Sequence, residues 1–138
     1  MEFAGNNLYL VAALVIIAVL ILKTEIGLKL SNVKQLNVND AVRLMNGENT
    51  VILDVREDNE FNSGHIRNSI HIPLASLSKR INELEKYKEK SILAVCRSGN
   101  RSNTACRTLN KQGFENVSNL AGGIMSWSSA NLPISKKK

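Results

Sequence analysis

An uninterrupted run of 15 apolar residues, Leu8 to Leu22, stands between the start of the chain and everything that follows. The run has no polar face over about four helical turns, as an amphipathic surface helix would have. With tolerated neighbours, and with the Lys23 side chain extended toward lipid headgroups, the span of residues 5–23 approaches the about 20 residues that cross a bilayer. The pattern predicts one N-terminal transmembrane helix, with an anchor over residues 1–23.

Two other interpretations of this run stay open. A cleavable secretory signal can be this short, but it has a basic start and a small-residue cleavage site. Here the start carries Glu2 and no Lys or Arg, and no Ala-x-Ala follows Lys23. A buried core helix is the other alternative, and the lack of a polar face disfavours it.

Basic residues around the run predict its orientation. Lys23, Lys29 and Lys34 follow the run, and no Lys or Arg precedes it. Positively charged flanks stay on the cytoplasmic side, so the rest of the chain is expected in the cytoplasm. The two cysteines, Cys96 and Cys106, fit a reducing compartment.

About 100 residues remain for folding, enough for a single domain. We expect a basic linker over 24–34, the domain over 35–133 and a solvated basic tail over 134–138. All 18 Lys and Arg residues lie at or after Lys23. Such a basic surface suits nucleic acid, anionic lipid or a small anionic substrate. The few scattered aromatic residues offer no stacking platform for bases, so we expect no nucleic-acid partner.

Short β-branched runs alternate with amphipathic segments through the domain. Strands are expected at Thr50–Asp54, Ser69–Ile72, Ser91–Val95 and Asn116–Leu120. Helices are expected at Asp40–Met45 after an Asn39 N-cap, at Glu57–Ser63, around Leu77–Leu84, at Asn100–Gln112 and after Gly122–Gly123. The alternation predicts an α/β fold with a central parallel sheet flanked by helices. Ligands of such sheets bind beyond the carboxyl ends of the strands.

Cys96 stands where one of these strands ends and a tight loop with Gly99 begins. Backbone N–H groups converge in such a loop, and the helix that follows adds positive potential. Arg97 and Arg101 add positive charge nearby. All three effects favour a thiolate, so Cys96 is predicted to be a nucleophile rather than a buried structural cysteine.

Three segments of the chain together resemble the rhodanese-like sulfurtransferases. Cys96–Ser102 is similar to the active-site loop of that family, whose cysteine carries a persulfide. Similar to its first signature are Leu53–Glu57, Glu60–Phe61, Gly64–Ile66 and Ile72–Pro73, and similar to its second are Leu120–Ile124, Trp127 and Leu132–Pro133. The resemblance covers Gln35 to Pro133, 99 of 138 residues. With the predicted anchor, the chain looks like the membrane-anchored single-domain rhodaneses of bacteria.

The chain departs from the family pattern at two places. Asn68–Ser69 stands where Gly-Ala is usual, and Asn131 stands where the family often has Gly. Neither position lies in the Cys96 loop, so the departures concern local backbone geometry and not the chemistry.

The resemblance implies a sulfurtransferase with a rhodanese-like domain over residues 35–133. A small anionic donor such as thiosulfate would give its outer sulfur to Cys96, and a thiol or protein cysteine would accept it from the persulfide. No metal or organic cofactor is expected. The implied location is the cytoplasmic (inner) membrane of a bacterium, with residues 5–23 in the bilayer.

The resemblance also assigns roles around Cys96. Substrate binding falls to the rest of the loop, namely Arg97, Ser98, Gly99, Asn100, Arg101 and Ser102. The hydroxyls of Ser98 and Ser102 would bond the terminal sulfur, and the two arginines would attract the anionic donor. Asp54 and Arg56 are expected to support the loop without reacting.

Other polar residues receive structural roles. His65 and His71 are expected in turns or packing, Trp127 in the core, and Cys106 buried within a helix rather than acting as a resolving thiol.

Two other functions compete with sulfur transfer. A cysteine phosphatase or arsenate reductase has a Cys-x5-Arg loop, but here Ser102 occupies the arginine position and Arg101 comes one residue early. A non-catalytic rhodanese-like scaffold at the membrane is the second alternative, and the presence of Cys96 argues against it.

Overall fold

The computed structural model describes residues 7–30, 33–47 and 49–136, with the side chains of residues 24–30 outside that description. The chain divides between residues 32 and 33 into an N-terminal unit and a larger C-terminal unit. Each unit is described by itself.

The N-terminal unit is helix α2, Leu8–Leu30. Its apolar side chains between Leu8 and Leu22 are largely exposed. Within the described part of the chain, no helix is both long enough and apolar enough to cross a membrane. The predicted transmembrane helix is therefore not supported by the structure.

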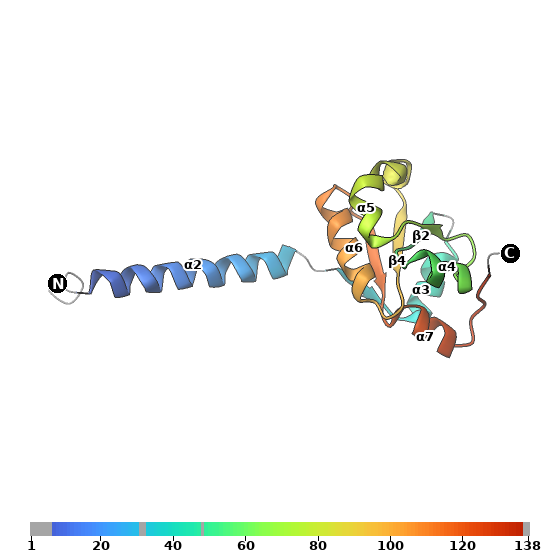
Figure 1. Ribbon diagram of the computed structural model, residues 1–138, viewed down its shortest axis with the longest axis horizontal. Coiled ribbons are helices and arrows are strands. Elements are labelled where there is room, and N and C mark those ends of the chain that lie inside the picture. The colour runs from blue at the N-terminus through green and yellow to red at the C-terminus, as the bar shows by residue number, and fades with distance from the viewer. Residues whose placement is uncertain (1–6, 31–32, 48, 137–138) are drawn as a thin grey trace. The chain divides into compact units, whose positions relative to one another are not determined.

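The C-terminal unit is a five-stranded sheet with helices on both faces (Figure 1). Its strands are β1 (Lys34–Leu36), β2 (Thr50–Asp54), β3 (Ile70–His71), β4 (Ser91–Val95) and β5 (Val117–Leu120). Its helices are α3 (Val38–Met45), α4 (Asp58–Ser63), α5 (Leu74–Arg80), the 3-10 helix η1 (Ile81–Tyr87), α6 (Asn100–Lys111) and α7 (Gly123–Ser129). The strand order is β1-β5-β4-β2-β3, and every pair is parallel. The predicted α/β fold with a central parallel sheet is confirmed.

Alternate side chains of each strand enter two separate cores, as the two-residue period of a strand requires. Ile92 and Ala94 of β4 face a core built with α5, η1 and α6, whereas Leu93 and Val95 face a core built with α3 and α7. Trp127 lies in the second core, as predicted, and its indole N–H donates to the Pro133 carbonyl at 3.0 Å. Both faces of β4 are thus covered, and packing on both faces holds the end of the strand in place.

Three local details differ from the sequence-based expectations. Strand β1 has only three residues, of which Leu36 alone is buried, so it left no pattern to detect. Helix α3 is capped by Asn37 rather than Asn39, because the Asn37 side chain accepts from the Asp40 amide at 2.9 Å. The expected single helix around residues 77–84 is α5 followed directly by the 3-10 helix η1.

The two departures from the family pattern have a common backbone explanation. Asn68 and Asn131 have positive φ angles of 64° and 57°. Glycine adopts this left-handed region most readily, and asparagine is among the few other residues that tolerate it. The two asparagines therefore preserve the backbone that a family glycine provides.

Candidate active site

Strand β4 carries Cys96 to the carboxyl edge of the sheet, next to β2. Asp54, the last residue of β2, pairs in register with Val95, so Cys96 follows directly beyond a paired strand end. Cys96 has 0% exposure. The chemistry is thus placed at the edge where parallel sheets bind their ligands.

The amino end of α7 turns the backbone of the Cys96 loop. The amides of Ile124 and Met125 donate to the carbonyls of Cys96 and Arg97, at 2.8 and 3.1 Å. Gly123 lies so close that a Cβ there would stand 2.3 Å from the Cys96 carbonyl oxygen. With these carbonyls directed at α7, the amides that follow are free to face the sulfur.

Several donors converge on the Cys96 sulfur. The Gly99 amide lies 3.1 Å from Sγ and the Ser102 hydroxyl 3.3 Å. Burial by itself would raise the pKa of the Cys96 thiol, but the Ser102 hydroxyl and the amides of Ser102, Gly99 and Ser98 outweigh burial and lower this pKa below its ordinary value. The thiolate predicted from the sequence therefore has a physical basis in these hydrogen bonds.

Gly99 makes this cradle possible through its backbone conformation. Its φ is 102°, a left-handed value that favours glycine. Gly99 caps helix α6, whose first residue is Asn100. The turn brings the amino end of α6 against the sulfur, where the helix dipole adds positive potential.

The donors to the sulfur are held from behind by Asn119 of β5, which is 2% exposed. Its side-chain nitrogen donates to the Gly99 carbonyl at 3.0 Å, and its side-chain oxygen accepts from the Ser102 hydroxyl. The same nitrogen also donates to Gln35 Oε1 on β1 at 2.9 Å. Asn119 was not predicted to be a site residue from the sequence. A polar residue within a predicted strand, three positions before Gly122, was the signal that could have identified it.

The two loop arginines take different positions. Arg101 forms a bidentate pair with Glu60 of α4, at 2.7 and 2.9 Å. The Arg101 hydrogen bond is the main reason why the pKa of Glu60 falls to about 2. Arg97 is exposed beside the loop. Both arginines were expected to attract the anionic donor, and the structure pairs the charge of Arg101 with Glu60.

Asp54 and Arg56 form a buried ion pair under the loop region, with Arg56 Nη2 2.7 Å from Asp54 Oδ2. Arg56 also donates to the carbonyls of Gly64 and Glu60, at 2.7 and 3.3 Å. These bonds tie Arg56 to the middle and the carboxyl end of α4, and Glu60 of the same helix pairs with Arg101. Asp54 and Arg56 are thus paired with each other and bonded to α4, an arrangement that suits the supporting role expected from the sequence.

The remaining candidates lie in structural surroundings. The rings of His65 and His71 each stack on the ring of Phe61, with centroids 3.9 and 4.3 Å away. Cys106 is buried on α6, and burial raises the pKa of its thiol to about 12. Ser98 and Asn100 are exposed at the rim of the loop, and Ser98 reaches the sulfur through its amide rather than its hydroxyl.

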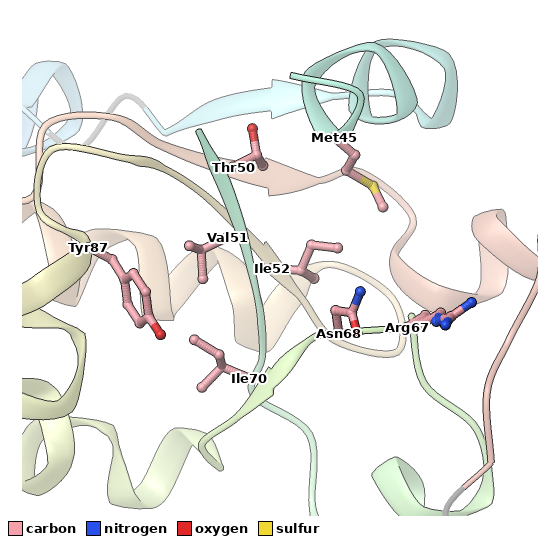
Figure 2. A pocket seen from close by; sticks show the side chains of 8 residues that line it. All are labelled: Met45, Thr50, Val51, Ile52, Arg67, Asn68, Ile70 and Tyr87. Carbon is pink, nitrogen blue, oxygen red and sulfur yellow. The ribbon is translucent and has the colours of Figure 1, made fainter. Parts of the chain in front are cut away.

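Of the hollows in the described part of the chain, two lie toward opposite ends of the sheet. One of about 250 Å³ adjoins the Cys96 loop, and its lining is Gln35, Ser98, Gly99, Asn100, Asn103, Asn119, Ala121 and Gly122. The other, of about 330 Å³, involves the first residues of β2, Thr50 to Ile52, together with Tyr87 and Arg67 (Figure 2). Because all strands are parallel, the second hollow lies toward the opposite end of the sheet from Cys96, and its lining holds no cysteine, histidine or carboxylate.

Metal binding finds no support in the described ranges, where no group of three or more His, Cys, Asp or Glu side chains is placed to hold an ion. The chemistry available at the site is that of a stabilised sulfur anion surrounded by N–H and O–H donors.

Known proteins are similar to this chain in both sequence and architecture. Residues 37–130 match the family described as the rhodanese-like domain. The uncharacterised protein YibN of Escherichia coli is 34% identical over 139 residues, which cover 100% of this chain and 97% of YibN. The thiosulfate sulfurtransferase GlpE of Shewanella oneidensis is 32% identical over 102 residues, covering 74% of this chain and 99% of GlpE. A crystal structure of a rhodanese-related protein from Thermoplasma volcanium superposes with a TM-score of 0.68 at 33% identity, covering 75% of this chain and 99% of that one.

Proposed function

Because this chain belongs to the rhodanese-like domain family, we propose that it is a sulfurtransferase whose Cys96 carries sulfur from a small anionic donor to a thiophilic acceptor. The observation that carries the proposal is the cradle of donors around Cys96 Sγ, with the Gly99 amide at 3.1 Å and the Ser102 hydroxyl at 3.3 Å. A cysteine kept only for packing needs no such set of donors.

The reaction has two covalent steps. The Cys96 thiolate attacks the outer sulfur of a donor such as thiosulfate, a new S–S bond forms, and the old S–S bond breaks as sulfite leaves with its electron pair. The product is a persulfide whose terminal sulfur is anionic, and the loop amides and the Ser102 hydroxyl stabilise it. A thiol acceptor, attacking as its thiolate, then takes the terminal sulfur and returns Cys96 to the thiolate.

Access to the sulfur favours a small donor. Cys96 has 0% exposure, and the cradle is closed behind by Asn119 and α7. A compact anion fits such a site better than a bulky one. Exposed Arg97 supplies the local positive charge for the donor, since Arg101 is committed to Glu60.

Two activity assays distinguish a sulfurtransferase from a phosphatase and from a non-catalytic scaffold. With thiosulfate as donor and cyanide as acceptor, the purified chain should form thiocyanate with ping-pong kinetics, and Cys96→Ser should form none. An aryl phosphate should not be hydrolysed, because Arg101 pairs with Glu60 and Ser102 stands at the position of the phosphatase arginine. Hydrolysis of the phosphate without thiocyanate would support a phosphatase, and inactivity in both assays would support a scaffold.

Membrane attachment is a separate part of the proposal. It rests on the apolar run of α2, whose side chains from Leu8 to Leu22 are largely exposed, and on the lysines that follow the run. We propose a single-pass attachment to a bacterial cytoplasmic membrane with the domain on the cytoplasmic side. The full chain should remain in the membrane fraction after an alkaline wash, whereas Ile16→Asp should release it, because a carboxylate at the centre costs about 3 kcal/mol. Release of the unaltered chain by the same wash would overturn this part.

A further inference from the structure

The Ser102 hydroxyl has one proton and two acceptors. Its oxygen lies 3.3 Å from Cys96 Sγ, and it also contacts Asn119 Oδ1 at a shorter distance. Ser102 is 0% exposed, so water does not supply a further partner from bulk solvent. At any moment the hydroxyl can donate to the sulfur or to the amide oxygen, and not to both.

The orientation of the Asn119 amide is fixed by its neighbours. Its nitrogen faces the Gly99 carbonyl at 3.0 Å, and a carbonyl can only accept. The other amide hydrogen goes to Gln35 Oε1 at 2.9 Å, while Gln35 Nε2 donates onward to Asn103 Oδ1 at 3.0 Å. The Asn119 oxygen is therefore the atom that faces Ser102, where it can serve only as an acceptor.

We propose that Asn119 is a positioning residue that holds the Ser102 hydroxyl while Cys96 is a neutral thiol and releases it to the sulfur when the sulfur becomes anionic. While the sulfur carries its proton, the hydroxyl donates to Asn119, and its lone pairs face the thiol, which can itself donate. When the thiol proton leaves to solvent, or when a persulfide anion forms, the hydroxyl turns to the sulfur.

The same amide also fixes the second donor. By bonding the Gly99 carbonyl, Asn119 holds the residue whose amide lies 3.1 Å from Sγ. One buried side chain on β5 thus sets both the direct amide contact and the switching hydroxyl. This role of Asn119 has a use in sulfur transfer only if the proposed function holds. The switch itself concerns only the ionisation of Cys96 and can be tested without a sulfur donor.

The other charged and titratable groups near the sulfur lie on α6, on α4 and at the end of β2. Arg101 on α6 has its pKa raised by Glu60, Glu60 on α4 has a pKa of about 2, and Cys106 on α6 has a pKa of about 12. Asp54 and Arg56 at the end of β2 are paired with each other. The imidazoles of His65 and His71, beyond α4, bond the carbonyls of Phe61 and Arg56. Because Cys106 is the other cysteine and its thiol has a pKa of about 12, thiolate absorbance that develops at lower pH reports Cys96.

A double-mutant cycle tests the switch without any sulfur donor. The Cys96 pKa is measured from thiolate absorbance in the full chain and in Ser102→Ala, Asn119→Leu and the double variant. Ser102→Ala should raise the Cys96 pKa by about one pH unit, because a donor to the charged sulfur is lost. Asn119→Leu loosens the loop whether residue 102 is Ser or Ala. Only when Ser102 is present does it also remove the oxygen that competes with the sulfur for the hydroxyl proton.

The predicted signature is a difference between backgrounds. The change caused by Asn119→Leu should be more negative, by about half a pH unit or more, with the Ser102 hydroxyl than without it. Equal changes in both backgrounds, or a difference of opposite sign, would overturn the proposal. Thr104→Ala, which removes an exposed hydroxyl from the same helix, is the matched control and should leave the Cys96 pKa unchanged.

A measurement on the unaltered chain guards against misfolded variants. The Asn119 side-chain amide resonances should move with the titration of Cys96, because the amide oxygen loses its donor when the sulfur ionises. Resonances that stay constant through that titration would overturn the switch. If the double-mutant cycle gives the predicted difference but Cys96 gains no sulfur from thiosulfate, the proposed function fails and the switch stands. The two failures are therefore distinguishable.

Discussion

Substitution of one glycine on α7 should disable the Cys96 loop while leaving the domain folded. A Cβ at Gly123 would stand 2.3 Å from the Cys96 carbonyl oxygen and 2.5 Å from that of Arg97, about 1 Å short of the 3.4 Å at which ordinary contact begins. Gly123→Ala must therefore push these carbonyls away by about 1 Å. A misplacement of about 1 Å can cost about 100-fold in rate, so sulfur loading from thiosulfate should slow by about that factor.

The chain supplies a matched control for this substitution. Gly113 also has a positive φ, 89°, but a Cβ there would meet only Lys88 side-chain atoms at 3.6 Å or more. Both alanines pay about 1–2 kcal/mol for the left-handed backbone, whereas only Gly123→Ala displaces the loop. Urea unfolding should show that both variants fold, and Gly113→Ala should load sulfur within about twofold of the unaltered chain. Equal loading rates for the two folded variants would refute the reasoning.

Three further predictions concern thiols and ion pairs. At neutral pH a small alkylating reagent should modify Cys96 and spare Cys106, whose buried thiol has a pKa of about 12, and peptide mass spectrometry showing preferential Cys106 labelling would contradict this. Glu60 has a folded pKa of about 2 against 4.5 unpaired, so its contribution to stability is present above pH 4.5 and is lost as the pH falls toward 2. After allowance for solvent screening, Glu60→Gln should lower the free energy of unfolding by about 1 kcal/mol at pH 7. In urea titrations at a series of pH values, the variant should lose less stability between pH 4.5 and 2 than the unaltered chain, and an equal loss would count against the pairing. Arg56→Met strands the Asp54 carboxylate, which is 0% exposed, and should lower the free energy of unfolding by about 3–5 kcal/mol; a loss below about 1 kcal/mol would show that the pair is not a support.

Local sequence patterns were sufficient to predict four of the five strands and the loop that holds Cys96. The apolar run before Cys96 and the glycine three residues later are contiguous signals, and they define strand β4, the loop and the start of α6. The parallel arrangement followed because helices separate the strands. The weakest local signal, in the three residues of β1, was missed since only Leu36 of that strand is buried.

Contacts between distant segments could not be predicted from those patterns. Arg101 pairs with Glu60, 41 positions earlier, and that pairing neutralises a positive charge that was expected to attract the anionic donor. Asn119 contacts Gln35, 84 positions away, through a pairing of β5 with β1 that the sequence did not indicate. The positions of these side chains depend on the strand order, which no single segment encodes.

The most direct test of sulfur transfer at Cys96 is the intact mass of the full chain after incubation with thiosulfate, beside Cys96→Ser. The account predicts a gain of one sulfur atom in the unaltered chain, complete loss of that gain on addition of cyanide, and no gain in the variant. A folded chain whose Cys96 can be alkylated but gains no sulfur from thiosulfate would contradict it.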